Sequence, residues 1–193
     1  MHLRHDRPPA PMRQCRPASW PAMSDPSASP DFPDKLPAQH WVRPGVGADA
    51  SAIDMWLATR APLTVPEARA RRLSLDALLA QGGQGICLLG GTDVVQDTFD
   101  CLLPVSLVHS LSVGGVGGRV AMVAEWWAPA MAADAWLAAC LAELADWCRA
   151  HGIRAIAVAP GLTSDATRPA EGFGPDASGM WVRNLVPTAK RLG

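Results

Sequence analysis

After residue 40, a short apolar segment is followed by apolar residues at helical spacing. A short apolar segment, Trp41-Val42-Arg43, ends at Pro44 and is typical of a strand. Ile53, Trp56 and Leu57 then recur at helical spacing behind Asp49, a residue type that favours the N-cap position. The sequence therefore predicts a strand and then a helix that ends before Pro62.

A second helix is predicted from the capping-box pattern Thr64-Val65-Pro66-Glu67, which has proline in its first turn. It runs to Gly82-Gly83, with a break allowed at Ser74. Arginines commonly form the solvated face of such a helix, and we expect this of three of them: Arg69, Arg71 and Arg72.

The remaining segments are apolar runs bounded by glycine or proline. We predict strands over 85–90, 101–113, 119–127, 154–159 and 180–185, a turn at 90–93, a glycine connection at 114–118 and a long helix over 131–151. The helix has an apolar stripe and ends before Gly152, which suits a left-handed cap. Because the helical crossover joins parallel strands, the order β-α-α-β-β-β-α-β-loop-β predicts an α/β (α+β) fold with a mixed sheet.

Composition divides the chain into one domain and two tails. Residues 1–40 are crowded with Pro, Ser, Asp and Arg and have no period, so we expect a disordered N-terminal tail. Residues 41–187 form the single predicted domain, and 188–193 a C-terminal tail. The polar residues after Met23 are typical of a protein start, so the segment before it is a candidate upstream extension, with Met1 the alternative start.

Charge, hydrophobicity and cysteine content indicate which partners and which cell compartment to expect. Seventeen basic and 18 acidic residues give a net charge of −1, which provides no electrostatic reason to bind nucleic acid or an anionic membrane. No apolar run is long enough to span a bilayer, and the N-terminus lacks a secretory signal. The five cysteines are scattered, with no C-x-x-C pair, so we expect reduced, mostly buried thiols in a cytoplasmic protein and no metal site.

Several segments together resemble the GNAT superfamily of acyl-CoA-dependent N-acyltransferases. Residues 41–53 resemble the opening strand and first helical turn of that family, and Val123-Ala-Glu-Trp-Trp-Ala-Pro129 is similar to its fourth strand. Residues 138–161 resemble the helix and fifth strand that follow. Gly172-Phe173 with 180–185 is similar to the closing hairpin. The resemblance covers most of residues 41–185 and implies a GNAT-like N-acyltransferase fold.

The resemblance also implies a reaction and a site. The expected activity is acetyl transfer from acetyl-CoA to a small amine or a protein amino group, with Glu125 or water taking the proton. The alternative for Glu125 is an ordinary exposed strand residue. The cofactor is expected between the fourth and fifth strands, with its diphosphate at the start of the following helix. The cofactor-binding residues implied in this way are Trp127, Ala128, Ala132, Ala133, Ala135 and Trp136.

Two features leave alternatives open. The family's cofactor loop reads Q/R-x-x-G-x-G/A, whereas residues 130–137 here contain no glycine and no arginine, and Asp134 adds a negative charge. A non-catalytic GNAT-like binding or interaction module, a possible pseudoenzyme that has lost CoA, is therefore the alternative function. Trp126 and Trp127 must face opposite sides of a strand, and one of them is a candidate for the acceptor groove or a homodimer contact, with plain packing as the default.

Overall fold

The computed structural model describes residues 36, 39–81, 83–93, 98–111, 117–163 and 168–185. Most of the predicted N-terminal tail, with Met23 and Cys15, lies outside these residues, as do the predicted C-terminal tail and most of the glycine connection at 114–118. The fold described below is that of the domain alone.

In the described residues, the domain has seven strands, three α-helices and two 3-10 turns. In chain order they are β1 (Trp41–Pro44), η1 (Gly47–Asp49), α1 (Ala50–Arg60), α2 (Val65–Leu79), β2 (Gly85–Gly91), β3 (Cys101–Ser110), β4 (Gly118–Val123), η3 (Ala130–Ala132), α3 (Ala133–Ala150), β5 (Ala155–Val158), β6 (Gly174–Pro175) and β7 (Trp181–Asn184). The predicted order is confirmed, and the two-residue strand β6 is added to it.

One mixed sheet contains all seven strands, in the order β1-β2-β3-β4-β5-β7-β6. Only β4 and β5 are parallel, and α3 connects them. Every other neighbouring pair is antiparallel. The mixed sheet predicted from the helical crossover is confirmed, because a chain that leaves one strand through a helix returns to the same end of the sheet.

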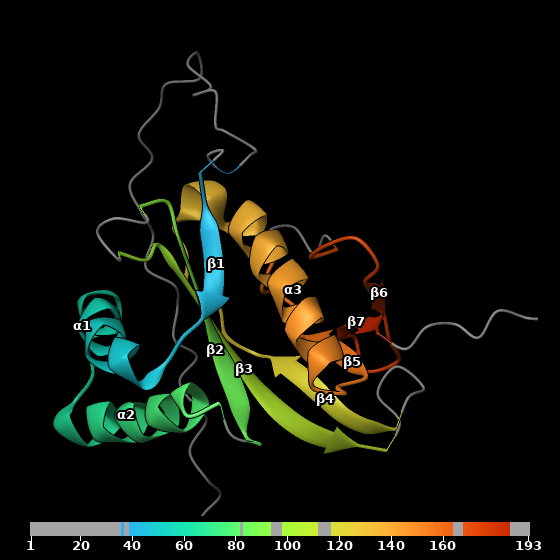
Figure 1. Cartoon of the computed structure of the whole chain (residues 1–193), viewed down its shortest axis with the longest axis horizontal. Coiled ribbons are helices and arrows are strands. Elements are labelled where there is room, and N and C mark those ends of the chain that lie inside the picture. Colours follow the sequence, from blue (N-terminus) through green and yellow to red (C-terminus); the bar gives the residue numbers. More distant parts are fainter. Residues whose placement is uncertain are drawn as a thin grey trace, which may run out of the picture. The chain divides into compact units, whose positions relative to one another are not determined.

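Helices cover both faces of the sheet, with α3 on one face and the α1–α2 pair on the other (Figure 1). Strand β2 shows the division most clearly, because all its residues are buried. Ile86 and Leu88 pack in the core under α3, whereas Cys87 and Leu89 pack against α1 and α2. Successive side chains of a strand point to opposite faces, so an unbroken apolar run serves both layers.

Helix α3 places its predicted stripe in the core. Leu137, Cys140, Leu141, Leu144 and Cys148 are buried there. The helix is followed by Gly152, whose φ of 67° is the left-handed conformation predicted for it. Four cysteines are buried as free thiols, as expected: Cys87, Cys101, Cys140 and Cys148.

Helix α2 differs from the prediction in two ways. It is continuous through Ser74, whose hydroxyl donates to the Ala70 carbonyl and leaves the helix unbroken. Arg71 also does not join the solvated face. Its side chain turns towards α1, where it donates to the Ala61 carbonyl at 3.0 Å and to Asp54 at 3.3 Å. The helix start is as predicted, with the Glu67 carboxylate accepting a hydrogen bond from the Thr64 N–H.

Gly90 and Gly91 were predicted to form a turn, and this is wrong. Both lie in β2, where they make room for aromatic rings instead of turning the chain. A Cβ atom on Gly90 would meet the Trp136 ring at 2.8 Å, and one on Gly91 would meet the Trp41 ring at 2.7 Å. A glycine pair gives the same sequence pattern in both situations.

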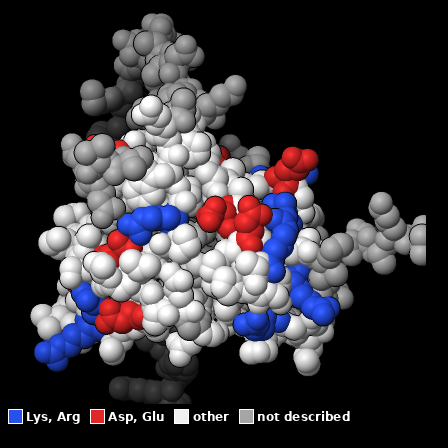
Figure 2. Space-filling view, viewed as in Figure 1, with Lys and Arg blue, Asp and Glu red and all other residues white. Residues whose placement is uncertain are grey.

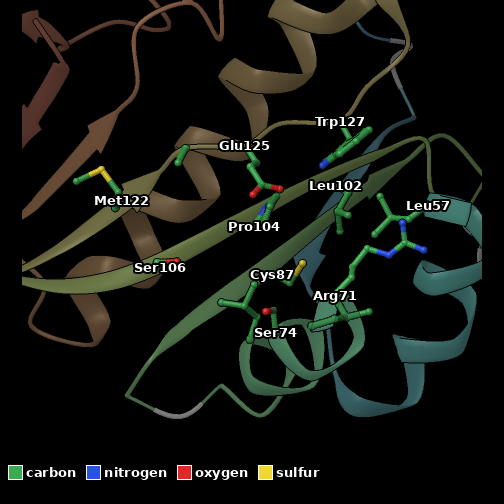
Figure 3. Close-up of a pocket in the computed structure, with 13 residues that line it drawn as sticks. Leu57, Arg71, Ser74, Cys87, Leu102, Pro104, Ser106, Met122, Glu125 and Trp127 are labelled. Carbon is green, nitrogen blue, oxygen red and sulfur yellow. The ribbon is translucent and has the colours of Figure 1, made fainter. Parts of the chain in front are cut away.

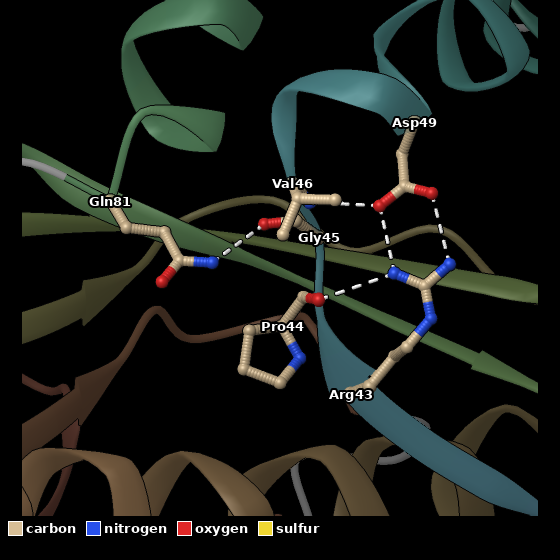
Figure 4. A network of polar contacts seen from close by, with 6 residues as sticks. All are labelled: Arg43, Pro44, Gly45, Val46, Asp49 and Gln81. Carbon is tan, nitrogen blue, oxygen red and sulfur yellow. Dashed lines mark hydrogen bonds and ion pairs between the residues drawn. The ribbon is translucent and has the colours of Figure 1, made fainter.

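Asp49 precedes α1 as predicted, but its side chain does not cap that helix. The carboxylate turns back to Arg43 on β1, which donates to it twice, at 2.7 and 2.9 Å (Figure 4). It also accepts a hydrogen bond from the Val46 N–H at 2.8 Å. Gln81, after α2, donates to the Gly45 carbonyl at 2.9 Å. These contacts fix the loop between β1 and α1.

The visible surface carries both signs of charge in small groups, with no broad area of one sign (Figure 2). This distribution agrees with the balanced composition. Among the described helices, none combines the length and hydrophobicity needed to cross a membrane.

Candidate functional site

Strands β4 and β5 separate at Val123. Up to that point they are paired in parallel, with Val120 opposite Ala155 and Val123 opposite Val158. The last bond across the pair is donated by the Ala159 N–H to the Val123 carbonyl, at 2.8 Å. Residues 124–126 have no strand partner, and Trp127 pairs only with Leu102 on β3. Beyond Val123 the chain therefore stays with β3 and leaves β5.

The pairing with β3 contains one extra residue at this place. Ser106 pairs with Met122, whereas Leu102, four residues before Ser106, pairs with Trp127, five residues after Met122. One residue of 123–126 therefore has no counterpart on β3, which is the definition of a β-bulge. A bulge bends the strand that carries it, and here that strand turns away from β5.

Pro104 explains why the bulge lies here. Both backbone groups of Leu102 bond to Trp127, and the Leu107 N–H bonds to Gln84 on the other side, so even-numbered residues of β3 face β4. Pro104 is even-numbered, and it has no N–H to offer the residues opposite it. The ladder loses one rung between β3 and residues 124–126, and proline inside a sheet is tolerated at such bulges.

The bulge leaves backbone donors free. In the part of the chain that the structure describes, no backbone carbonyl accepts a hydrogen bond from the amides of Ala124, Glu125 or Trp126. Ala124 and Glu125 are exposed. These amides can therefore bind an oxygen atom of a ligand that enters where β4 and β5 separate.

A cavity of about 280 Å³ adjoins the bulge on the face covered by α1 and α2. One wall carries Glu125 and Trp127 and the opposite wall is α2 (Figure 3). Its lining is mostly apolar and consists of Leu57, Arg71, Ser74, Leu75, Leu78, Cys87, Leu102, Pro104, Ser106, Met122, Ala124, Glu125 and Trp127.

Glu125, the predicted base, lies in the bulge and not within β4. Its carboxylate lines the cavity and is directed inwards (Figure 3). It has no ion-pair partner among the described residues. The adjacent tryptophans face opposite sides, as predicted: Trp126 packs under α3 and Trp127 packs against the core of α1 and α2. Glu125 as a base stays a prediction.

Arg71 is the only basic residue among the described residues that line the cavity. Two of its nitrogens bond to Asp54 and to the Ala61 carbonyl, and its Nε atom is buried without a partner. The guanidinium thus connects α2 to α1, and its charge is balanced by Asp54, so the cavity wall carries no free cation.

The start of α3 holds the residues predicted to bind the cofactor. The turn η3 leads into the helix, and Ala132 at the N-cap position makes no side-chain cap. The first turn of a helix presents backbone N–H groups that the regular bonds of that helix do not use. Ala128, Ala132, Ala133 and Ala135 are small and partly buried.

Trp136 is placed differently from these alanines. Its side chain is buried in the core beside Gly90, and only its backbone N–H belongs to the first turn of the helix. Asp134 is exposed in that same turn, and none of residues 124–148 is basic. The start of α3 thus offers backbone donors and one negative charge.

The sequence interpretation did not find the α2 wall of the cavity. Arg71, Ser74, Leu75 and Leu78 line it at the spacing of one helical face. The same spacing is present in the sequence, but a run of arginines is typical of a solvent-exposed helix face, and that was the face predicted for Arg71. In the described ranges, no group of three or more His, Cys, Asp or Glu side chains could hold a metal ion.

No protein-family model and no curated protein sequence matches the chain. Solved structures do match it, among them GNAT family acetyltransferases. The GNAT family N-acetyltransferase YhbS from Escherichia coli, solved with CoA, is 19% identical and gives a TM-score of 0.53, with 79% of this chain and 85% of that one covered.

A GNAT family acetyltransferase from Brucella melitensis, solved with acetyl-CoA, is 17% identical with a TM-score of 0.51, covering 77% of this chain and 89% of that one. NAA60 from Arabidopsis thaliana, solved with a bisubstrate analogue, is 10% identical with a TM-score of 0.50, covering 75% and 98%. At these identities the likeness concerns the fold alone. The chain therefore has the fold of the GNAT superfamily of N-acetyltransferases.

Proposed function

We propose that this protein is an acyl-CoA-dependent N-acyltransferase whose acceptor amine enters the cavity between the bulge and α2. One observation carries the proposal: free backbone amides at the bulge lie beside a cavity that also contains an unpaired carboxylate, Glu125. Acyl transfer to an amine requires donors that hold the carbonyl oxygen of the acyl group and a base that accepts the amine proton.

The residues present fit the thioester end of acyl-CoA. When bound, this molecule would supply an acyl group activated as a thioester. The amides of residues 124–126 would donate to its carbonyl oxygen and to the amide groups of its pantetheine arm, in the manner of an added strand.

The diphosphate end would rest on the start of α3. The N–H groups of a helix's first turn and the helix dipole favour an anion, and the alanines there allow a close approach of the backbone. No basic side chain of residues 124–148 adds to this, and Asp134 opposes it. We therefore expect binding by backbone donors alone, and weaker than a site with arginine would give.

Glu125 would take the proton of the reaction. The neutral amine forms a bond from its nitrogen to the acyl carbon, the carbon–sulfur bond breaks, and the sulfur leaves with its electron pair. The amine proton passes to the Glu125 carboxylate, directly or through water, and the thiolate regains a proton from solvent. Glu125 is exposed at the cavity mouth, so the proton can then leave to bulk water.

Calorimetric titration of acetyl-CoA and of CoA into the full chain tests the binding half of the proposal. Saturable binding near micromolar, about −8 kcal/mol, is the expected result. Absence of binding up to millimolar concentrations contradicts it.

Glu125→Gln tests the catalytic half. Acetyl-CoA affinity should stay unchanged, because the backbone amides remain, while kcat for amine acetylation should fall by about 10²–10⁴ through loss of the base. Glu171→Gln removes an exposed carboxylate that does not line the cavity and serves as the control. An unchanged kcat and pH–rate profile for Glu125→Gln would assign the proton transfer to water alone.

A second candidate is a binding module with this fold that no longer uses CoA. The observation in its favour is Asp134 in the first turn of α3 together with the lack of basic residues over 124–148. It is supported if wild type binds no acetyl-CoA and Asp134→Asn does not restore binding.

A further inference from the structure

The charges in the cavity wall are not balanced. Glu125 is the only acidic residue among the described lining residues, and Arg71 is the only basic one. Arg71 is already paired with Asp54, which lies outside the cavity lining, at 3.3 Å. The electrostatic character of the cavity is therefore that of one free carboxylate.

Arg71 is a poor partner for a ligand carboxylate, because its charge is already paired with Asp54. One terminal nitrogen donates to Asp54 and the other to the Ala61 carbonyl, and the Nε atom is sealed from solvent by its neighbours. Figure 3 shows the guanidinium turned towards α1 and away from Glu125. A ligand anion at this group would compete with Asp54 for the charge of the guanidinium.

The rest of the wall is uncharged and mostly apolar, with Ser74 and Ser106 as polar side chains. Leucines of α1 and α2 form one side, and Leu102, Met122 and Trp127 form the other. A volume of about 280 Å³ is at the lower end for a small-molecule pocket and holds one compact organic group. Such a lining favours a hydrocarbon body. Its serine hydroxyls can bond a neutral polar group, but they provide no charge to pair with a carboxylate.

We propose that the acceptor is a small primary amine on an apolar body, with no carboxylate of its own. Its ammonium group, before it loses the proton, pairs with Glu125, and its apolar part lies between α2 and Trp127. Free amino acids are disfavoured, because their carboxylate would be buried without a cation near Glu125. This acceptor class rests on the proposed N-acyltransferase function, and its test is arranged so that the two fail separately.

Three acceptors that share one aromatic body provide the test: 2-phenylethylamine, L-phenylalanine and L-phenylalanine amide. Acetyl transfer by the full chain is measured for each, with kcat/KM corrected for the fraction of free amine. We expect 2-phenylethylamine to exceed L-phenylalanine by about tenfold or more, since an unpaired carboxylate would be desolvated. The neutral amide controls for bulk and should stay close to 2-phenylethylamine. Equal or better use of L-phenylalanine overturns the proposal, and preference for the amide over 2-phenylethylamine points to peptide N-termini instead.

A charge variant sharpens the result. Ser106→Lys adds a cation to an exposed lining position and should raise kcat/KM for L-phenylalanine relative to 2-phenylethylamine by about tenfold. Leu73→Lys adds the same charge on α2 outside the lining and should leave the ratio unchanged. The same ratio in both variants would overturn the argument from charge.

Binding of the amines alone separates this inference from the proposed function. Saturation-transfer NMR on the full chain, without acetyl-CoA, should detect 2-phenylethylamine at concentrations where L-phenylalanine gives no signal. That result supports the acceptor class even if no acetyl transfer occurs, in which case only the proposed reaction fails. Equal signals, or no signal from 2-phenylethylamine, contradict the acceptor class whatever the transfer assay gives.

Discussion

Replacement of Asp49 by asparagine should destabilise the domain through the loop between β1 and α1. The carboxylate accepts two hydrogen bonds from Arg43 and one from the Val46 N–H, all between 2.7 and 2.9 Å (Figure 4). Asparagine keeps the shape and one acceptor oxygen but loses the charge and the paired geometry. Because α1 carries Leu57 into the cavity wall, the change also loosens one side of the candidate site.

The expected loss is about 1–2 kcal/mol. A hydrogen bond to a charged group contributes about 1.5–3 kcal/mol when well buried, and an exposed ion pair about 0–1 kcal/mol. Here the Asp49 side chain is 12% exposed and the Arg43 side chain 35%, so solvent screens part of the interaction and the estimate lies between the two limits. The amide oxygen of asparagine can still accept the hydrogen bond from the Val46 N–H, so this bond is not counted in the expected loss of stability.

The loss should depend on pH. The hydrogen bonds from Arg43 are the main reason that the pKa of Asp49 lies below its ordinary value of 3.8, with burial opposing them. A carboxyl group with a lowered pKa in the folded state stabilises the fold above its unfolded pKa and ceases to do so as the pH falls through its folded pKa. The difference between wild type and Asp49→Asn should therefore be full at pH 7 and shrink below about pH 4.

Urea unfolding of wild type and variant at pH 7 and at several acidic values measures this difference. Asp76→Asn is the matched control, because it breaks the exposed Arg72–Asp76 pair on α2 and should cost no more than about 0.5 kcal/mol. A loss in Asp49→Asn no larger than in the control, or one that stays constant down to about pH 2.5, would refute the reasoning.

Two further variants test the sheet and the start of α3. Gly90→Ala should cost about 1–3 kcal/mol in urea unfolding, because the new Cβ atom would lie 2.8 Å from Cys101 and Trp136, which are buried and cannot yield. Gly47→Ala, where a Cβ atom meets nothing within 4 Å, is its control, and equal stability of the two would contradict the packing argument. Asp134→Asn should tighten acetyl-CoA binding about fivefold in calorimetry, since about 1 kcal/mol of repulsion between charges separated by water is removed. The gain should vanish in high salt, and an unchanged affinity at low salt would mean that the diphosphate lies away from Asp134.

Local patterns predicted the elements well because each depends on neighbours in the sequence. The start of α2 at Thr64 and the cap at Gly152 need only a few adjacent residues, and both are present. The mixed sheet followed from one crossover rule. Errors occurred where a distant residue decides the outcome.

Three residues show this dependence on distant partners. Gly90 lies in a strand because Trp136 fills the space beside it, 46 positions later in the printed sequence. Arg71 turns inwards because Ala61 and Asp54 offer acceptors across the α1–α2 corner. Asp49 faces Arg43 because β1 runs beside it. No spacing rule contains these partners.

The predicted site residues can be located in the fold. Glu125 follows β4 beyond its pairing with β5, and Ala132, Ala133 and Ala135 lie at the start of α3. The bulge itself could have been expected from Pro104, had the register of β3 been known, because proline matters only on the side that faces β4. Their roles in binding and catalysis stay predictions.

The free donors at the bulge belong to the backbone, and this affects how the site can be dissected and how it can change. An alanine scan across 124–126 would leave all three amides in place and would miss them. A scan would detect only what side chains add, such as the carboxylate of Glu125. Peptide-to-ester replacement, which removes an N–H and keeps the side chain, is the operation that would expose their contribution. Substitutions at residues 124–126 other than proline likewise keep these N–H groups. At position 104, in contrast, any residue other than proline would add a backbone N–H that faces residues 124–126.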